Sequence, residues 1–162
     1  MNELPRSLKV TTVWLLLLLV LFVAAQAWLR HQKSARFSAS SGVIEIRRAD
    51  DGHYHWPGAL NGHSVEFLID TGATASAIPA ALAQELGLQS LGTMHSQTAG
   101  GEVAGDVVLA DMSLQGGVRI DRLRLGALPR LSSPLLGMDV LGRLRWQQNE
   151  GVLRVELQSP AP

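Results

Sequence analysis

The pattern of hydrophobic and polar positions divides the chain into one continuous apolar segment and a longer region of short alternating stretches. The apolar segment spans residues 10–29 and contains no charged residue. A helix of this length crosses the hydrocarbon core of a bilayer, which is about 30 Å thick. Trp14 and Trp28 lie near its two ends, where indole rings favour the membrane interface. The pattern therefore predicts a transmembrane helix, with residues 1–9 as its N-terminal flank.

A cleaved signal peptide is the alternative interpretation of this segment. Arg6 and Lys9 would form its positively charged start, and Ala25-Gln26-Ala27 resembles a small-x-small cleavage site. Positive residues flank the segment on both sides, so the charge distribution barely decides its orientation. We expect a single-pass membrane protein whose folded domain lies outside the cytoplasm, on the periplasmic side. Cleavage would instead give a secreted protein.

The rest of the chain indicates a linker followed by one β-rich domain. Residues 30–42 are polar and serine-rich, which favours a flexible linker. Residues 43–157 form the predicted folded domain, and residues 158–162 form a short tail. Within that domain, apolar and polar residues alternate over several short stretches, which predicts strands at 43–46, 53–60, 63–69, 103–114, 118–125 and 151–157.

Turn and helix signals separate these strands. Asn61-Gly62 predicts a tight hairpin between two of them, and Gly116-Gly117 predicts a second hairpin. A helix is predicted at residues 80–86, because Pro79 precedes it and a glycine follows it. Residues 138–141 predict about one further helical turn. Many short strands with one or two short helices indicate an all-β fold, a small closed barrel.

Composition excludes several classes of function. The 162 residues carry 14 basic and 14 acidic side chains, so net charge gives no reason to expect nucleic acid as a partner. There is no cysteine, which removes thiolate nucleophiles and cysteine-based metal sites. His53, His55 and His63 have no accompanying ligands at the usual spacing, and we interpret them as solvated strand residues. We expect neither a metal nor a cofactor.

Candidate chemistry centres on Asp70-Thr71-Gly72-Ala73, which directly follows the apolar run Phe67-Leu68-Ile69. An aspartate at the end of a buried strand needs hydrogen-bond donors, because an unpaired buried charge is costly. Gly72 lets the backbone fold back so that its N–H meets the carboxylate. Thr71 supplies a hydroxyl that can hydrogen-bond within a tight loop. The alternative is an ordinary strand-ending turn with aspartate at its first position.

A second element lies downstream, where Leu135-Leu136-Gly137 is followed by a short helical stretch. A strand ending in Asp-Thr-Gly-Ala, then a hairpin, an apolar-apolar-Gly strand and a helix resembles the retropepsin-like aspartic proteases, which include retroviral and membrane-anchored bacterial members. The resemblance covers residues 43–157 and implies an acid-protease barrel. It assigns catalysis to Asp70, support of the catalytic loop to Thr71, Gly72 and Ala73, the substrate-binding flap to Thr98, Ala99, Gly100 and Gly101, and an inner strand to Leu135, Leu136 and Gly137.

The sequence departs from the retroviral pattern at two positions. Retroviral members usually carry an arginine after the downstream glycine, paired with an acidic residue two positions beyond the loop glycine. Met138 and Thr74 occupy these positions here. Both charges are missing together, which leaves no unpaired buried charge. A dimer of this chain must therefore be held by other contacts.

The resemblance implies a homodimer. Peptide hydrolysis of this type needs two carboxylates about 3 Å apart that share one proton. One carboxylate takes a proton from the attacking water while the other polarises the scissile carbonyl. The chain contains a single Asp-Thr-Gly, so a second copy must supply the other aspartate across a two-fold axis. We expect an aspartic endopeptidase that acts on peptide or protein substrates, in which Thr71 joins the two loops and Gly72 binds the substrate backbone.

Two alternatives stay open. The chain could keep this fold as a non-catalytic, membrane-anchored module for peptide binding or dimerisation, or it could be an unrelated barrel in which Asp70 is a turn residue. The remaining polar and aromatic candidates have structural interpretations. His95 is expected in a flap strand, Asp139 at the helix start, Trp56 and Trp146 in the core or an interface, while Ser76 and Ser96 lack the His–Asp pair of a serine hydrolase.

Overall fold

The N-terminal apolar segment is helical. The computed structural model describes residues 6–34, 37–40, 42–98 and 101–157. Two compact units divide the chain, Met1–Arg36 and Phe37–Pro162. The first unit holds α1 (Arg6–Ser34), in which the large apolar side chains from Val10 to Val23 are exposed.

The transmembrane interpretation of residues 10–29 is not confirmed. Of the residues that can be placed, none belongs to a helix with the length and apolar character needed to cross a bilayer. The membrane anchor and the periplasmic location therefore stay predictions from the sequence.

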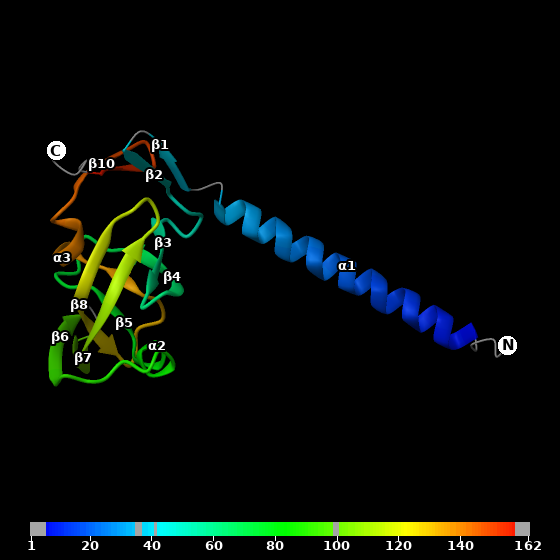
Figure 1. The fold of residues 1–162 in the computed structure, drawn as a ribbon, viewed down its shortest axis with the longest axis horizontal. Coiled ribbons are helices and arrows are strands. Elements are labelled where there is room, and N and C mark those ends of the chain that lie inside the picture. The colour runs from blue at the N-terminus through cyan, green and yellow to red at the C-terminus, as the bar shows by residue number, and fades with distance from the viewer. Residues whose placement is uncertain (1–5, 35–36, 41, 99–100, 158–162) are drawn as a thin grey trace. The chain divides into compact units, whose positions relative to one another are not determined.

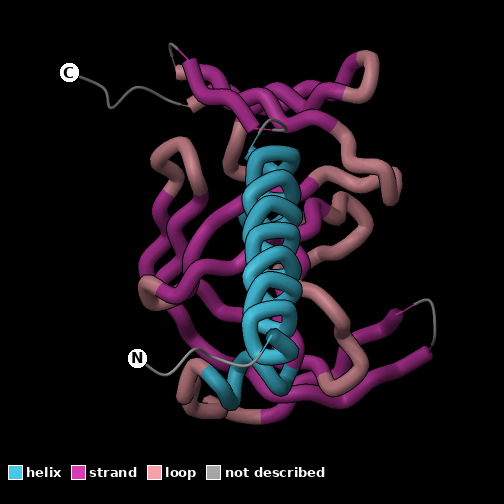
Figure 2. Tube along the Cα trace, turned by 90° about the vertical axis from the view of Figure 1, so that its right-hand side faces the viewer, coloured by secondary structure: helices cyan, strands magenta, loops and turns pink. Residues whose placement is uncertain are grey.

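The second unit consists of strands and two short helices (Figure 1). Strands account for most of its path, as the magenta segments of Figure 2 show. In chain order the elements are β1 (Phe37–Ser40), β2 (Val43–Arg47), β3 (His55–Leu60), β4 (His63–Ile69), β5 (Ala77–Pro79), α2 (Ala80–Glu85), β6 (Thr93–Thr98), β7 (Gly101–Leu114), β8 (Arg119–Leu128), β9 (Leu135–Leu136), α3 (Met138–Leu141), β10 (Arg145–Asn149) and β11 (Val152–Glu156).

The larger sheet closes on itself, which confirms the predicted barrel. Its strands follow the order β3-β4-β9-β5-β8-β7, and β7 pairs with β3 to complete the ring. β6 extends from the ring by pairing with β7. Closure leaves only short edges exposed, which is how small all-β domains avoid unpaired backbone groups.

The local signals in the sequence account for most of these elements. Asn61 and Gly62 both have positive φ, 47° and 83°, as a two-residue hairpin turn requires. The two predicted hairpins, β3–β4 and β7–β8, are therefore confirmed. The predicted helices are confirmed as α2 and α3, and Pro79 precedes α2 with a φ of −56°.

The four-stranded sheet β1-β2-β11-β10 differs from the sequence prediction. Residues 30–42 were expected to form a flexible linker, yet α1 continues to Ser34 and Phe37–Ser40 pairs with β2. The local sequence of β1 is serine-rich and has little strand signal. It was not predicted, because pairing with β2 rather than intrinsic propensity makes this segment a strand. β10 was missed for the same reason, since its residues are mostly exposed and polar.

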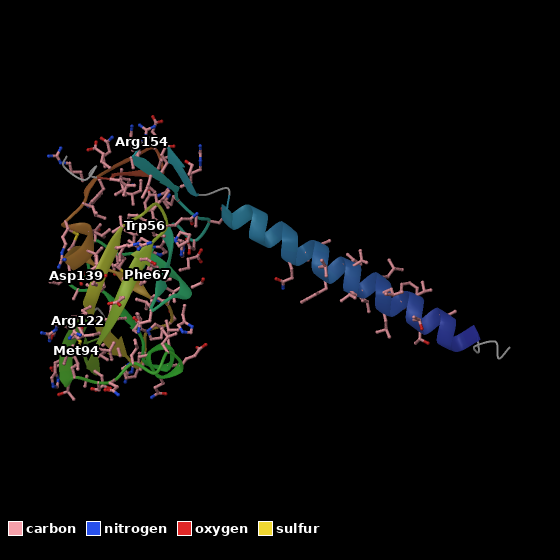
Figure 3. The ribbon with its side chains drawn as sticks, viewed as in Figure 1. Trp56, Phe67, Met94, Arg122, Asp139 and Arg154 are labelled. Atoms are coloured by element: carbon pink, nitrogen blue, oxygen red, sulfur yellow. The ribbon has the colours of Figure 1, made fainter. Side chains whose placement is uncertain are left out.

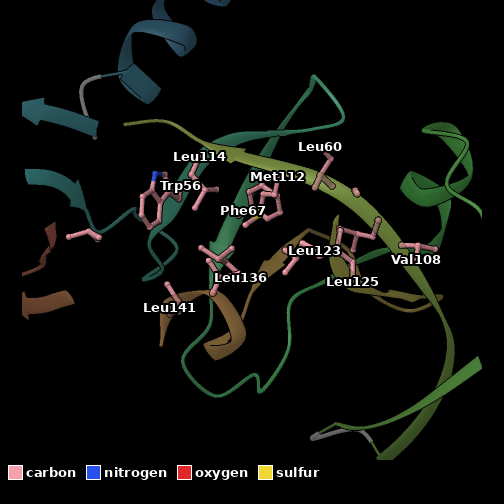
Figure 4. Close-up of a cluster of buried hydrophobic side chains, with 14 of the residues drawn as sticks. Trp56, Leu60, Phe67, Val108, Met112, Leu114, Leu123, Leu125, Leu136 and Leu141 are labelled. Atoms are coloured by element: carbon pink, nitrogen blue, oxygen red, sulfur yellow. The ribbon is translucent and has the colours of Figure 1, made fainter. Parts of the chain in front are cut away.

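One hydrophobic core joins the two sheets. Trp56 and Phe67 are fully buried in the barrel, together with Leu136 from the short strand β9 (Figure 4). Ile44 and Val155 of the four-stranded sheet belong to the same cluster. The Trp56 indole N–H donates to the Gln115 carbonyl at 2.9 Å, which satisfies its polar group inside the core. The core therefore fixes β4 and β9, the two strands that lead into the site described below.

Candidate active site

Asp70 lies immediately after β4, where the chain leaves the barrel wall. Its backbone N–H donates to the Leu136 carbonyl at 3.0 Å, which continues the β4–β9 pairing by one residue. Its carboxylate Oδ1 accepts the Gly72 N–H at 2.9 Å, as the sequence predicted. A Cβ atom at Gly72 would lie 3.2 Å from that same oxygen. Glycine at this position therefore lets the loop fold tightly around the carboxylate.

The inner strand lies directly beside the strand that carries Asp70. β4 and β9 are parallel, and Ile69 is paired with Leu136. Leu136 is buried and anchors β9 in the core, whereas Leu135 is partly exposed. An unrelated barrel in which Asp70 is only a turn residue would be indicated by an Asp70 that lies far from this strand, whereas Asp70 is bonded to it. That interpretation is wrong.

Gly137 allows the two segments to approach closely. A Cβ atom at this position would lie 2.6 Å from the Ala75 carbonyl carbon and 2.9 Å from the Ala73 carbonyl oxygen. The Met138 N–H donates to the Ala73 carbonyl at 2.8 Å, and the Asp139 N–H donates to the Thr74 carbonyl at 3.1 Å. The start of α3 therefore binds the backbone of the Asp70 loop directly.

A pair formed by the buried Ser76 and the partly buried Asp139 was missed by the sequence analysis. The Ser76 hydroxyl donates to Asp139 Oδ1 at 2.7 Å, and the Ser76 N–H donates to the same oxygen at 2.9 Å. Asp139 also accepts the Val140 N–H at 3.0 Å, which confirms its expected place at the helix start. Figure 3 labels Asp139, which lies in the first turn of α3. Because Ser76 and Asp139 are distant in sequence, the only available signal was a polar residue preceding the apolar pair Ala77-Ile78.

The loop presents an uncovered face in the single chain. Asp70 is half-buried, whereas Thr71, Gly72 and Thr74 are exposed. Met138, which stands at the position of the retroviral arginine, has 38% of its surface exposed. A partly exposed carboxylate surrounded by exposed loop residues is accessible to a second protein surface.

The predicted flap corresponds to the hairpin β6–β7. Thr98 pairs with Gly101, and Ala99 and Gly100 lie outside the described residues. His95 Nδ1 lies 3.0 Å from Glu102 Oε1 across the hairpin, and both side chains are largely exposed. The strand assignment of His95 is thus confirmed, while the contact of the flap with substrate stays a prediction.

The three N-terminal histidines of the domain do not converge. His55 Nε2 lies 2.7 Å from Asp51 Oδ2, and His63 is exposed on β4. The pKa of Asp51 is lowered, first by the hydrogen bond from the His53 N–H and then by the hydrogen bond with His55. Throughout the placed residues, no three side chains of metal-binding type come together.

The chain resembles known proteins in sequence. The sequence profile of the family described as gag-polyprotein putative aspartyl protease matches residues 56–143, more than half of the chain. The chain is also 30% identical over 116 residues to the uncharacterized protein RP867 of Rickettsia prowazekii. That match covers 69% of this chain and 50% of the relative, so the chain spans about half the length of that protein.

Two solved structures share the fold. The retropepsin-like aspartic protease from Rickettsia conorii superposes with a TM-score of 0.58 at 24% identity, over 74% of this chain and 94% of that one. The EIAV protease, solved in complex with an inhibitor, superposes with a TM-score of 0.51 at 20% identity, over 60% of this chain and 93% of that one. These likenesses establish a retropepsin-like barrel.

Proposed function

Since the chain belongs to the family of gag-type, retropepsin-like aspartyl proteases, we propose that it is an aspartic endopeptidase in which Asp70 is the catalytic residue. The observation that supports this role is the setting of the Asp70 carboxylate. It follows the buried strand β4, accepts the Gly72 N–H at 2.9 Å, and lies on a loop bonded to β9 and α3. A carboxylate held this firmly, yet accessible from outside, can act on a bound water.

The active form in this proposal is a homodimer. One chain contributes a single Asp-Thr-Gly loop, and the chemistry requires two carboxylates. The exposed Thr71 and Gly72 beside Asp70, together with the exposed Met138, support a contact between two copies of this loop. A two-fold axis through the contact would place each Asp70 opposite its symmetry mate.

The mechanism follows from two carboxylates at close range. Because two negative charges about 3 Å apart repel each other, the pair holds one proton between them. The ionised Asp70 of one chain takes a proton from water, whose oxygen attacks the carbonyl carbon of the substrate. The protonated Asp70 of the other chain donates a hydrogen bond to the carbonyl oxygen. When the resulting tetrahedral intermediate collapses, the carbon–nitrogen bond breaks and a proton passes to the leaving amine.

The substrate in this proposal is an extended peptide. β7 joins the ring through its pairing with β8, which begins at Asp106, whereas residues 101–105 of β7 pair with β6 and extend the hairpin beyond the ring of strands. An extended peptide can bind beneath such a hairpin as an added strand, through backbone hydrogen bonds. Movement of the hairpin would admit the peptide and then exclude water.

Cleavage of a peptide library by the full chain in detergent tests the proposal. We expect the wild type to cleave and Asp70→Asn to be inactive, because an amide cannot take the proton from water. Asp121→Asn is the matched control, since it removes an exposed carboxylate from β8 and should cleave normally. Normal turnover by Asp70→Asn would refute the catalytic role. A wild type that binds peptides without cleaving them would instead favour the non-catalytic module.

A further inference from the structure

Ser76 has an unusual place in the folded domain. Of the residues whose burial is described, it is the only polar one that is buried, and its exposure is 0%. A buried hydroxyl needs hydrogen-bond partners, because loss of its water contacts is otherwise uncompensated. It obtains them from the segment that carries the inner strand and α3. The hydroxyl accepts the Gly137 N–H at 3.0 Å and donates to Asp139 Oδ1 at 2.7 Å.

Asp139 collects three donors on one oxygen. Its Oδ1 accepts the Ser76 hydroxyl, the Ser76 N–H at 2.9 Å and the Val140 N–H at 3.0 Å. Hydrogen bonds to an ionised carboxylate are about twice as strong as those between neutral groups. One side chain therefore joins the end of the Asp70 loop to the first turn of α3. These hydrogen bonds alone do not distinguish a purely structural role from a role in catalysis. The place of the pair along the Asp70 loop does.

The Ser76–Asp139 pair closes the far end of the Asp70 loop. At the near end, the Asp70 N–H donates to the Leu136 carbonyl at 3.0 Å. Between the two ends, the Ala73 carbonyl accepts the Met138 N–H at 2.8 Å. Residues 70–76 and 136–139 thus run beside each other and are joined at both ends. With both ends fixed, the loop has little freedom to move the Gly72 N–H away from the Asp70 carboxylate.

We propose that Asp139 is a positioning residue, which acts through Ser76 to hold the Asp70 loop in its reactive geometry. This inference rests on the proposed function, because the geometry matters to catalysis only if Asp70 is catalytic. Asp139 itself touches neither Asp70 nor, in this proposal, the substrate. Its loss should lower the rate of the chemical step more than the binding of peptide, since a misplaced carboxylate still leaves the substrate-binding strands intact.

Three variants and one control separate positioning from general stability. Asp139→Ala removes the acceptor, Asp139→Asn keeps an acceptor oxygen without the charge, and Ser76→Ala removes the hydroxyl. Asp111→Ala is the control, because Asp111 Oδ1 likewise accepts a backbone N–H, that of Arg122 at 2.8 Å. That contact joins β7 to β8 and involves no residue of the Asp70 loop. All four variants are made in the full chain, and kcat, KM and the unfolding midpoint are measured for each.

Positioning predicts a distinct outcome for each variant. We expect Asp139→Ala to lower kcat at least about tenfold in fully folded protein, with KM nearly unchanged, because small displacements of reacting groups have large effects on rate. Asp139→Asn should recover most of the lost rate, and Ser76→Ala should resemble Asp139→Ala. Asp111→Ala should lower the unfolding midpoint and leave kcat unchanged. An unchanged kcat in Asp139→Ala, or an Asp139→Asn variant as slow as Asp139→Ala, would overturn the inference.

Amide hydrogen exchange supplies a readout that does not need activity. Removal of the Asp139 acceptor should speed exchange in the peptide that contains residues 70–76, while exchange in β7 stays as in the wild type. Unchanged exchange in that peptide would overturn the positioning role, whether or not the protein cleaves anything. A wild type without activity but with the expected exchange pattern would refute the proposed function and leave the structural part of the inference standing. If Asp139→Ala does not fold, cleavage kinetics and amide hydrogen exchange are measured on Asp139→Asn and Ser76→Ala instead.

Discussion

Gly137→Ala is the substitution that tests most directly whether the Asp70 loop must pack closely against β9 and α3. The added Cβ would lie 2.6 Å from the Ala75 carbonyl carbon, 2.8 Å from the Ala75 oxygen and 2.9 Å from the Ala73 oxygen. All three atoms belong to the backbone, so no side chain can rotate away. Moving from 2.6 Å to ordinary contact at 3.4 Å requires the loop to shift by about 0.8 Å.

That shift should change both the free energy of unfolding and kcat. Overpacking of this kind costs about 1–3 kcal/mol in the free energy of unfolding. A displacement of about 1 Å in a reacting group can lower the rate about a hundredfold, so kcat should fall by one to two orders of magnitude. The decrease in kcat should therefore exceed anything that the loss of folded protein explains. Urea unfolding of the full chain gives the first quantity, and peptide cleavage by the folded variant gives the second.

Gly58→Ala provides the matched control for this experiment. A Cβ at Gly58 would lie 2.5 Å from the Ser113 carbonyl oxygen, a clash as severe as the one at Gly137. It falls between β3 and β7, where the Asp70 loop makes no backbone contact. We expect Gly58→Ala to lose stability and retain its kcat per folded molecule. If Gly137→Ala cleaved at the wild-type rate, close packing of the loop would not be needed for activity and the reasoning would fail.

Three further predictions address the dimer and the response to pH. Adding an equal amount of Asp70→Asn to a fixed amount of wild type should lower cleavage to about half, because random pairing leaves only a quarter of all dimers with two aspartates; full activity in the mixture would contradict a shared site. Met138→Glu should reduce sedimenting dimer and cleavage together by at least about tenfold, since it would place like charges beside the proposed two-fold axis; Met138→Leu is its control, and an intact Met138→Glu dimer would exclude this surface. Asp51 has a lowered pKa, so its ionised form stabilises the fold above its ordinary value of 3.8, and that contribution is lost as pH falls further. Asp51→Asn should therefore be less stable than the wild type at pH 7, and the two urea midpoints should converge as the pH falls below 3.8; a constant difference between pH 7 and the acid end of the titration would show that Asp51 is not involved.

Short-range sequence patterns predicted most of the strands and helices of the fold. The turn at Asn61-Gly62 and the alternation on either side are short-range features, and the hairpin β3–β4 formed as expected. β5 has three residues and β10 is mostly exposed and polar, so neither has a periodic pattern long enough to recognise. β1 depends on pairing with β2. Strands whose stability comes from a distant partner cannot be read from their own residues.

In the candidate site, too, contacts between near neighbours in sequence were predicted and contacts between distant residues were not. The hydrogen bond from the Gly72 N–H to Asp70 joins residues two positions apart, and the chemistry of glycine in a tight loop predicted it. The Ser76–Asp139 pair joins residues 63 positions apart. Nothing in either local sequence indicates that the other will be its partner. The sequence therefore predicted the hydrogen bond between Gly72 and Asp70, the proposed catalytic carboxylate, whereas the longer-range contacts that hold the loop became evident only in the folded chain.

The contacts within one chain bear on how two chains could assemble. The Asp70 loop is bonded to Leu136, Met138 and Asp139 before any partner arrives, so its shape does not depend on the second copy. Assembly then costs little conformational entropy, because the surfaces that meet are already ordered. Thr74 and Met138 stand where retroviral members carry an acidic residue and an arginine, and they bring no charge that the interface would have to desolvate. A preformed loop with a neutral surround can therefore support the proposed dimer without the ion pair that the retroviral pattern supplies.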